Sequence, residues 1–175
     1  MLLFKELKGV EAHLLTQREY AALVKTATQK VIKEYIKLRN QARADLDAWD
    51  KSNPEPKRPE HYASGAEYER WHNKRESHRN DWGHEYQKLY HLSTSVEQCK
   101  RNIILANVIE TGRIDECRKN PSFWMYFGGV NNPLMNQGQA VFRALYQGKY
   151  VPQNVLDEWP EGVEQVRKQI AESAA

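Results

Sequence analysis

The sequence has 175 residues and a mass of 20.5 kDa, and 40% of the residues are hydrophobic and 28% charged, which is enough apolar material for a folded core. This composition excludes a disordered tail, and a mean hydropathy of −0.83 without a run of 18 apolar residues excludes a membrane-spanning segment. The formal net charge of +3 and the pI of about 8.8 are too mildly basic to identify a nucleic acid or any other partner.

The start of the chain and its cysteines bear on its location. The opening Met1-Leu2-Leu3-Phe4 is interrupted at once by Lys5 and Glu6, so we expect no signal peptide. Cys99 and Cys117 are too few and too far apart for a disulfide framework and are expected to be free thiols. Together these features predict a cytoplasmic protein.

The first element is expected to be a short β-hairpin within residues 2–15, because Lys8-Gly9 stands between leucine-rich flanks. Thr16 and Glu19 then have the spacing of a capping box, which marks the start of a helix. Apolar residues recur every three or four positions from Tyr20 to about Asp50. At 1.5 Å per residue this helix would be roughly 50 Å long, so it needs an equally long partner.

A linker at about 52–63 ends the first long helix, because three prolines there remove backbone donors. A second capping box, Ser64 and Glu67, begins another helical stretch that extends to Gly112. We expect the two stretches to form an antiparallel helical hairpin. Gly83 or the Ser/Thr run at 93–95 should kink or break the second helix, because these residues disfavour a helix interior.

Shorter elements follow residue 112. Asn132 and Gly148 have the positions of an N-terminal cap and a C-terminal end, which predicts a helix from about Pro133 to Gln147, and a last helix follows Pro160. Five bulky apolar residues at 123–127 are expected to hold this part against the hairpin. The predicted fold class is all-α, with the hairpin within 1–112, a C-terminal helical subdomain at 113–175, and both in one structural unit.

Histidines cluster between the linker and the middle of the second helical stretch. Five of the six fall within 31 residues: His61, His72, His78, His84 and His91. Zinc ligands on a helix are three or four residues apart, whereas these histidines are separated by six residues or more. We therefore expect no metal site, and no motif in the chain predicts a cofactor.

One short motif within this histidine-rich window suggests chemistry. The stretch Arg79-Asn80-Asp81-Trp82-Gly83-His84-Glu85-Tyr86 has the form R-N-x-x-x-H-x-Y. It resembles the signature of HEPN ribonucleases, small all-α domains that cleave RNA without a metal at a site formed across a dimer. The resemblance covers these eight residues alone.

The resemblance implies a role for each matching residue. Arg79 would neutralise the scissile phosphate and Asn80 would position the motif. His84 would act as an acid or base, with Tyr86 in support. This chemistry is reasonable, because histidine titrates near neutrality and a guanidinium offers paired donors to phosphate. Residues five apart lie about 140° apart around a straight helix, so a homodimer or a kink would be needed to assemble the site.

The preferred interpretation is a non-enzymatic accessory protein that docks on a larger protein or nucleoprotein, in the style of phage, other mobile-element or defence-related proteins. The candidate binding residues are Trp71, Arg75 and Trp82 in the second helical stretch and Lys30, Lys33 and Lys37 in the first. The lysines belong to a basic series, completed by Lys25, Arg39 and Arg43, that either contacts phosphates or forms a solvated face. RNA stays open as a partner, and no membrane partner is expected.

Other enzyme and DNA-binding classes are disfavoured. The sequence has no phosphate-binding or dinucleotide-binding glycine loop and no GxSxG elbow. Ala144, Gly148 and Val155 have a spacing that loosely resembles a helix-turn-helix. Asp157 and Glu158 would repel DNA phosphates from that segment, so ordinary helical packing is expected there.

Overall fold

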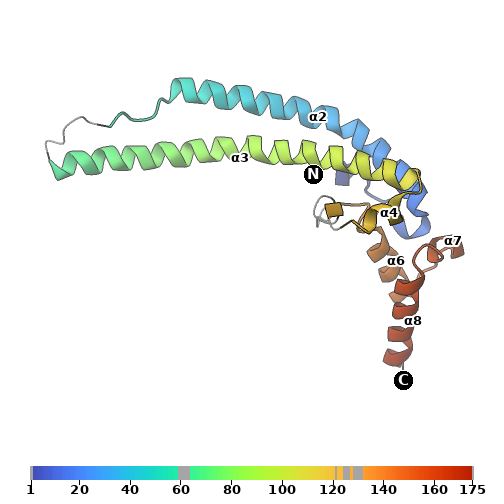
Figure 1. Ribbon diagram of the computed structural model, residues 1–175. Coiled ribbons are helices and arrows are strands. Elements are labelled where there is room, and N and C mark those ends of the chain that lie inside the picture. Colours follow the sequence, from blue (N-terminus) through green and yellow to red (C-terminus); the bar gives the residue numbers. More distant parts are fainter. Residues whose placement is uncertain (1, 59–63, 121, 124–126, 128–131, 175) are drawn as a thin grey trace. The chain divides into compact units, whose positions relative to one another are not determined.

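The computed structural model describes residues 2–58, 64–120, 122–123, 127 and 132–174, and over these residues the fold is all-α with no strand. Two long helices, α2 (Gln17–Ser52) and α3 (Gly65–Glu110), pack as a hairpin (Figure 1). The short elements are α1 (Leu2–Glu6), the 3-10 helix η1 (Ala12–Leu14), α4 (Ile114–Arg118), α6 (Gln137–Tyr146), α7 (Gln153–Leu156) and α8 (Pro160–Ala174). The predicted all-α hairpin with smaller C-terminal helices is confirmed.

The β-hairpin expected at residues 2–15 is wrong, because this stretch forms α1 and η1. Leu3 and Leu7 lie four residues apart and are both buried, which is the spacing of one helical face. The backbone N–H of Leu7 donates to the carbonyl of Leu3 at 3.1 Å. The leucines that suggested strand flanks therefore form an apolar helical face.

The break expected in the second long helix does not occur, because α3 is continuous from Gly65 to Glu110. Thr94 Oγ1 and Ser95 Oγ donate to the carbonyls of Tyr90 and His91, one turn back, at 3.0 and 2.9 Å. These bonds satisfy the hydroxyl groups along the helix without opening it.

The helix starts follow the predicted capping boxes. The Thr16 backbone N–H donates to Glu19 Oε2 at 2.9 Å, and the Glu19 N–H donates to Thr16 Oγ1 at 3.3 Å. At the start of α3, the Glu67 N–H donates to Ser64 Oγ at 3.3 Å. Helix α2 ends at Ser52, where the predicted linker begins.

The helix predicted from Pro133 begins four residues later, as α6, because residues 133–136 form a turn. Asn132 Oδ1 accepts a hydrogen bond from the Leu134 N–H at 3.1 Å within that turn. Gly148 follows α6 with a φ of +67°, and the Lys149 N–H donates to the Ala144 carbonyl at 2.9 Å. Only glycine adopts this left-handed ending without cost, so the predicted end of the helix is confirmed.

The chain divides into two compact units, of which unit 1 comprises residues 1–32 and 98–175. In its C-terminal part, α6, α7 and α8 surround a buried aliphatic cluster of Val141, Ala144, Val151, Val155, Leu156 and Val163. The residues whose spacing resembled a helix-turn-helix lie in or beside this cluster. Phe123 and Phe127 are also buried, with ring centroids 4.9 Å apart, whereas residues 124–126 of the predicted aromatic cluster lie outside the described residues. The boundary predicted near residue 112 falls inside this unit.

Unit 2 comprises residues 33–97, the parts of α2 and α3 on either side of the linker. Half-buried and buried residues of α3 recur at positions 71, 75, 78, 85, 89, 92 and 96, a spacing typical of a seam between two helices. Four of its described residues are buried: Tyr35, Leu46, Leu89 and Val96. The seam from 71 to 85 is therefore built from polar and aromatic side chains.

Candidate interaction surface on the helical hairpin

Polar contacts hold the end of the hairpin, where the chain leaves α2. The Arg75 Nε donates to Glu55 Oε1 at 3.1 Å, and the Trp71 indole N–H donates to the Pro56 carbonyl at 3.2 Å. His78 Nε2 lies 2.7 Å from the Asn53 carbonyl. A carbonyl only accepts, so this nitrogen carries the proton. Trp71 and Arg75, two of the predicted binding residues, thus fasten residues 55–56 to α3.

Three neighbouring rings on α3 are exposed in unit 2, and we call them the aromatic row: Trp82, Tyr86 and Tyr90. The rings of Trp82 and Tyr86 are stacked, with centroids 4.9 Å apart and planes within 10°, and Tyr86 and Tyr90 follow at 6.5 Å. Their residues are 36%, 42% and 56% exposed. Large apolar groups are therefore held in fixed positions on the surface of a helix.

A groove runs beside this row between α2 and α3, with a volume of about 440 Å³. We call it the arginine groove, and it is lined by Arg39, Asn40, Arg43, Tyr86, Leu89, Tyr90 and Ser93. None of these lining residues is acidic. Arg39 donates to Asn40 Oδ1 at 3.0 Å, and neither Arg39 nor Arg43 forms an ion pair with a carboxylate among the described residues.

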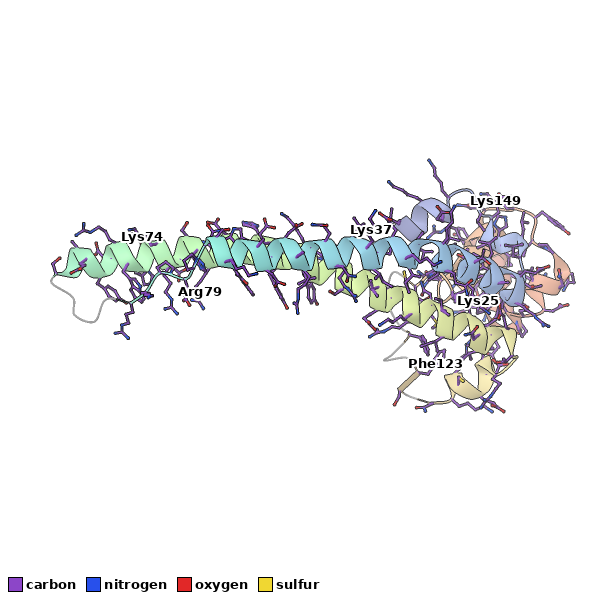
Figure 2. All side chains as sticks on the ribbon, turned by 90° about the horizontal axis from the view of Figure 1, so that it is seen from above. Lys25, Lys37, Lys74, Arg79, Phe123 and Lys149 are labelled. Carbon is purple, nitrogen blue, oxygen red and sulfur yellow. The ribbon has the colours of Figure 1, made fainter. Side chains whose placement is uncertain are left out.

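The residues of the HEPN-like motif lie along one uninterrupted helix. Arg79 and His84 are both exposed, and five residues of straight helix separate their directions by about 140°. Arg79 projects from α3 (Figure 2) and lies 3.7 Å from Glu76. It lines a hollow of about 420 Å³ with His78 and Trp82, but without His84. Asn80 is exposed and Tyr86 belongs to the aromatic row, so one chain alone does not bring the four motif residues together.

The residues of the basic series on α2 fall into three groups according to their contacts. Lys25 pairs with Glu110 and Lys30 with Glu6, each at 2.6 Å. Lys33 and Lys37 are exposed and form no ion pair among the described residues (Lys37, Figure 2). Arg39 and Arg43 are the members that line a groove with aromatic rings.

The histidines are spread along the hairpin. His72, His84 and His91 are exposed, His78 packs on Trp49 with ring centroids 5.1 Å apart, and His61 lies outside the described residues. In the part of the chain that the structure describes, no group of three His, Cys, Asp or Glu residues is placed to hold a metal ion. No helix among the described residues is long and apolar enough to cross a membrane.

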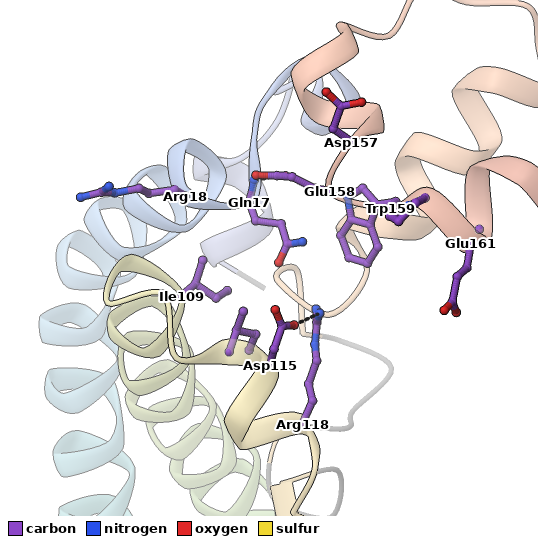
Figure 3. A pocket seen from close by; sticks show the side chains of 13 residues that line it. Gln17, Arg18, Ile109, Asp115, Arg118, Asp157, Glu158, Trp159 and Glu161 are labelled. Atoms are coloured by element: carbon purple, nitrogen blue, oxygen red, sulfur yellow. Dashed lines mark hydrogen bonds and ion pairs between the residues drawn. The ribbon is translucent and has the colours of Figure 1, made fainter.

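Unit 1 contains a hollow of about 710 Å³ between α2, α4 and the start of α8 (Figure 3). Arg118 reaches Asp115 at 3.4 Å and lies over the ring of Trp159, 5.6 Å from its centroid. The Gln17 N–H donates to Glu158 at 2.7 Å. Burial raises the pKa of the Glu158 carboxyl, although this hydrogen bond acts to lower it. Arg118 and Glu158 thus already have partners within the wall.

No family model, curated protein or solved structure matches this chain. The surface of the hairpin is therefore the basis for assigning a function. The candidate surface includes Trp82, which the sequence singled out for binding, and Arg39 and Arg43, which it named only within the basic series. The sequence did not single out Tyr90 for binding. The spacing of 82, 86 and 90, four residues each, is the signal in the sequence that places the three rings on one helical face.

Proposed function

We propose that this protein is a non-enzymatic binding protein that attaches to a larger protein or nucleoprotein through the aromatic row on α3. The observation that carries the proposal is the stacking of Trp82, Tyr86 and Tyr90 at an exposed position. Exposed tyrosines and tryptophans are the residues that contribute most to binding energy when a partner covers them.

The stacking makes the row suitable for binding. An aromatic side chain has few rotatable bonds, and a ring held against its neighbour loses little further freedom when a partner covers it. Covering apolar surface yields about 25 cal/mol per Å², so the area still exposed on three rings is a substantial source of affinity. The rings contribute little to the interior of unit 2, because they remain between one third and three fifths exposed.

The proposal is tested by photo-cross-linking of the full-length protein. A benzoylphenylalanine replaces Tyr90, and in a matched control it replaces Tyr150, an isolated tyrosine of unit 1 that is 76% exposed. Both proteins are irradiated in an extract of the cells that produce the protein. We expect a discrete covalent complex from position 90 and at least about tenfold less from position 150.

A further substitution links the complex to the row. Trp82→Ser in the position-90 protein removes one stacked ring and should reduce the yield of the complex. Equal yields from positions 90 and 150, or a yield that Trp82→Ser leaves unchanged, would show that the row is not the binding surface.

A further inference from the structure

We propose that the arginine groove binds a single-stranded nucleic acid, with bases packed against the exposed parts of Tyr86 and Tyr90 and phosphates held by Arg39 and Arg43. This inference rests on the proposed function and names the chemistry of the partner. A nucleoprotein partner would then be recognised through its exposed RNA or DNA.

The groove is lined by two cations from one helix and two rings from the other, with similar spacing along each helix. Arg39 and Arg43 are four residues apart on α2, a rise of about 6 Å along the helix. The rings of Tyr86 and Tyr90 are four residues apart on α3, with centroids separated by 6.5 Å. Both helices contribute to one groove, so successive nucleotides can meet the same pair of groups, a guanidinium and a ring.

The charges around the groove favour a polyanion. In the segments 33–43 and 86–97, five cationic side chains (Lys33, Lys37, Arg39, Arg43 and Lys88) stand against two acidic ones (Glu34 and Glu97). Lys88 pairs with Glu85 at 2.7 Å, so the four cations of α2 carry the positive charge of this region. Acidic residues outnumber cationic ones in the remaining described part of unit 2, residues 44–58 and 64–85. The positive potential of this unit is thus concentrated where the rings are exposed, which is the arrangement that single-strand-binding proteins use.

The composition of the groove favours nucleotides over a peptide helix. A groove for an amphipathic helix is lined by aliphatic side chains, whereas the one aliphatic residue here, Leu89, is only 7% exposed. The remaining lining groups are guanidinium, phenol, amide and hydroxyl groups. Guanidinium groups bind phosphate oxygens in pairs, and tyrosine rings accept any base because every base has an aromatic face.

The test is fluorescence anisotropy of a labelled 20-nucleotide single strand of mixed sequence with the full-length protein. The RNA strand, the DNA strand of the same sequence and the corresponding duplex form three arms. We expect saturable binding of at least one single strand and weaker binding of the duplex. Salt should weaken the binding of the single strand. The slope of the logarithm of the association constant against the logarithm of the salt concentration should be smaller by about 1.4 in the Arg39→Ala/Arg43→Ala variant, because each phosphate contact to a single strand contributes about 0.7.

Matched variants separate the groove from general charge. Arg70→Ala/Lys74→Ala also removes two cations four residues apart in unit 2 and should bind almost as the wild type. Tyr86→Ala/Tyr90→Ala should weaken binding at least about fivefold per ring, whereas Tyr86→Phe/Tyr90→Phe should retain it. Circular dichroism confirms that each variant is folded.

The inference is overturned if no single strand binds, if the duplex binds best, or if the two double cation variants lose affinity equally. The cross-link from position 90 then distinguishes the two proposals. A complex that resists nuclease and is digested by protease would retain the binding function with a protein partner. The absence of both strand binding and a position-specific cross-link would remove both proposals.

Discussion

In the C-terminal part of unit 1, α6, α7 and α8 enclose Val141, Val155 and Val163, each at most 5% exposed, whereas in unit 2 the rings of Tyr86 and Tyr90 are 42% and 56% exposed. The first region has the composition of an ordinary aliphatic core. The second has four buried residues among those described, and three of its large aromatic side chains, Trp82, Tyr86 and Tyr90, are exposed.

The difference indicates how the two regions use their apolar residues. Removing aliphatic groups from water stabilises the fold of unit 1, and close packing makes each of those groups sensitive to change. A ring left on the surface contributes little to folding and stays available for a partner. Stability is therefore associated with the aliphatic core of unit 1, and the binding that we propose with the hairpin surface of unit 2.

The largest expected effect comes from a pair of neighbours in unit 1. Leu105 is fully buried, whereas the adjacent Ile104 on α3 is 44% exposed. Leu105→Ala should lower the free energy of unfolding by about 2–5 kcal/mol through lost burial and a residual cavity, and Ile104→Ala by less than about 1 kcal/mol. Urea unfolding followed by circular dichroism measures both. Similar losses in the two variants would contradict the assigned core.

A smaller effect is expected at Gly162, where α8 approaches α6. A Cβ atom built on this residue would overlap the ring of Phe142, which lies beside the aliphatic cluster. Gly162→Ala should therefore cost about 1–3 kcal/mol, although alanine is the better helix former. Gly83→Ala is the matched control, because a Cβ there meets nothing within 4 Å, and it should stabilise α3. If thermal unfolding shows that both substitutions stabilise the protein, the close contact is wrong.

The next prediction concerns the two thiols. Burial raises the pKa of Cys99 to about 11, so its thiol stays protonated in the folded protein at pH 8. A thiol-specific disulfide reagent should therefore modify Cys117, which lines a surface hollow, and should reach Cys99 only after denaturation. Rapid modification of both cysteines in the folded state would show that the interior of the hairpin is open.

The same thiol makes stability depend on alkaline pH. Between about pH 9 and pH 11 the unfolded chain releases this proton and the folded chain retains it, so the free energy of unfolding falls as the pH rises. Burial also raises the pKa of Tyr20, which adds to the loss of stability at alkaline pH. Cys99→Ala should make the fall shallower in urea titrations at pH 8, 9 and 10. A steeper fall in this variant would contradict the burial of Cys99.

Much of the fold could be predicted from local sequence signals. The capping residues form bonds at the ends of their own helices, so their spacing alone was sufficient to predict where those helices begin or end. These residues are Thr16 with Glu19, Ser64 with Glu67, and Gly148. The β-hairpin at 2–15 was wrong because Leu3 and Leu7 are placed by a tertiary core, which overrides the turn preference of Lys8-Gly9. The arginine groove could not be predicted, because it depends on the register of α2 against α3. The resemblance of Arg79 and His84 to a ribonuclease motif stays a prediction that requires a second chain.

The most direct test of the central claim is the unfolding free energy of Tyr86→Ala/Tyr90→Ala beside that of Leu89→Ala. All three residues lie on the same stretch of α3, but Leu89 is buried and the two tyrosines are exposed. If the aromatic row serves binding, the double variant should stay within about 1 kcal/mol of the wild type, while Leu89→Ala loses about 2–5 kcal/mol. A loss in the double variant as large as that in Leu89→Ala would show that the rings hold the fold together, and would contradict the account.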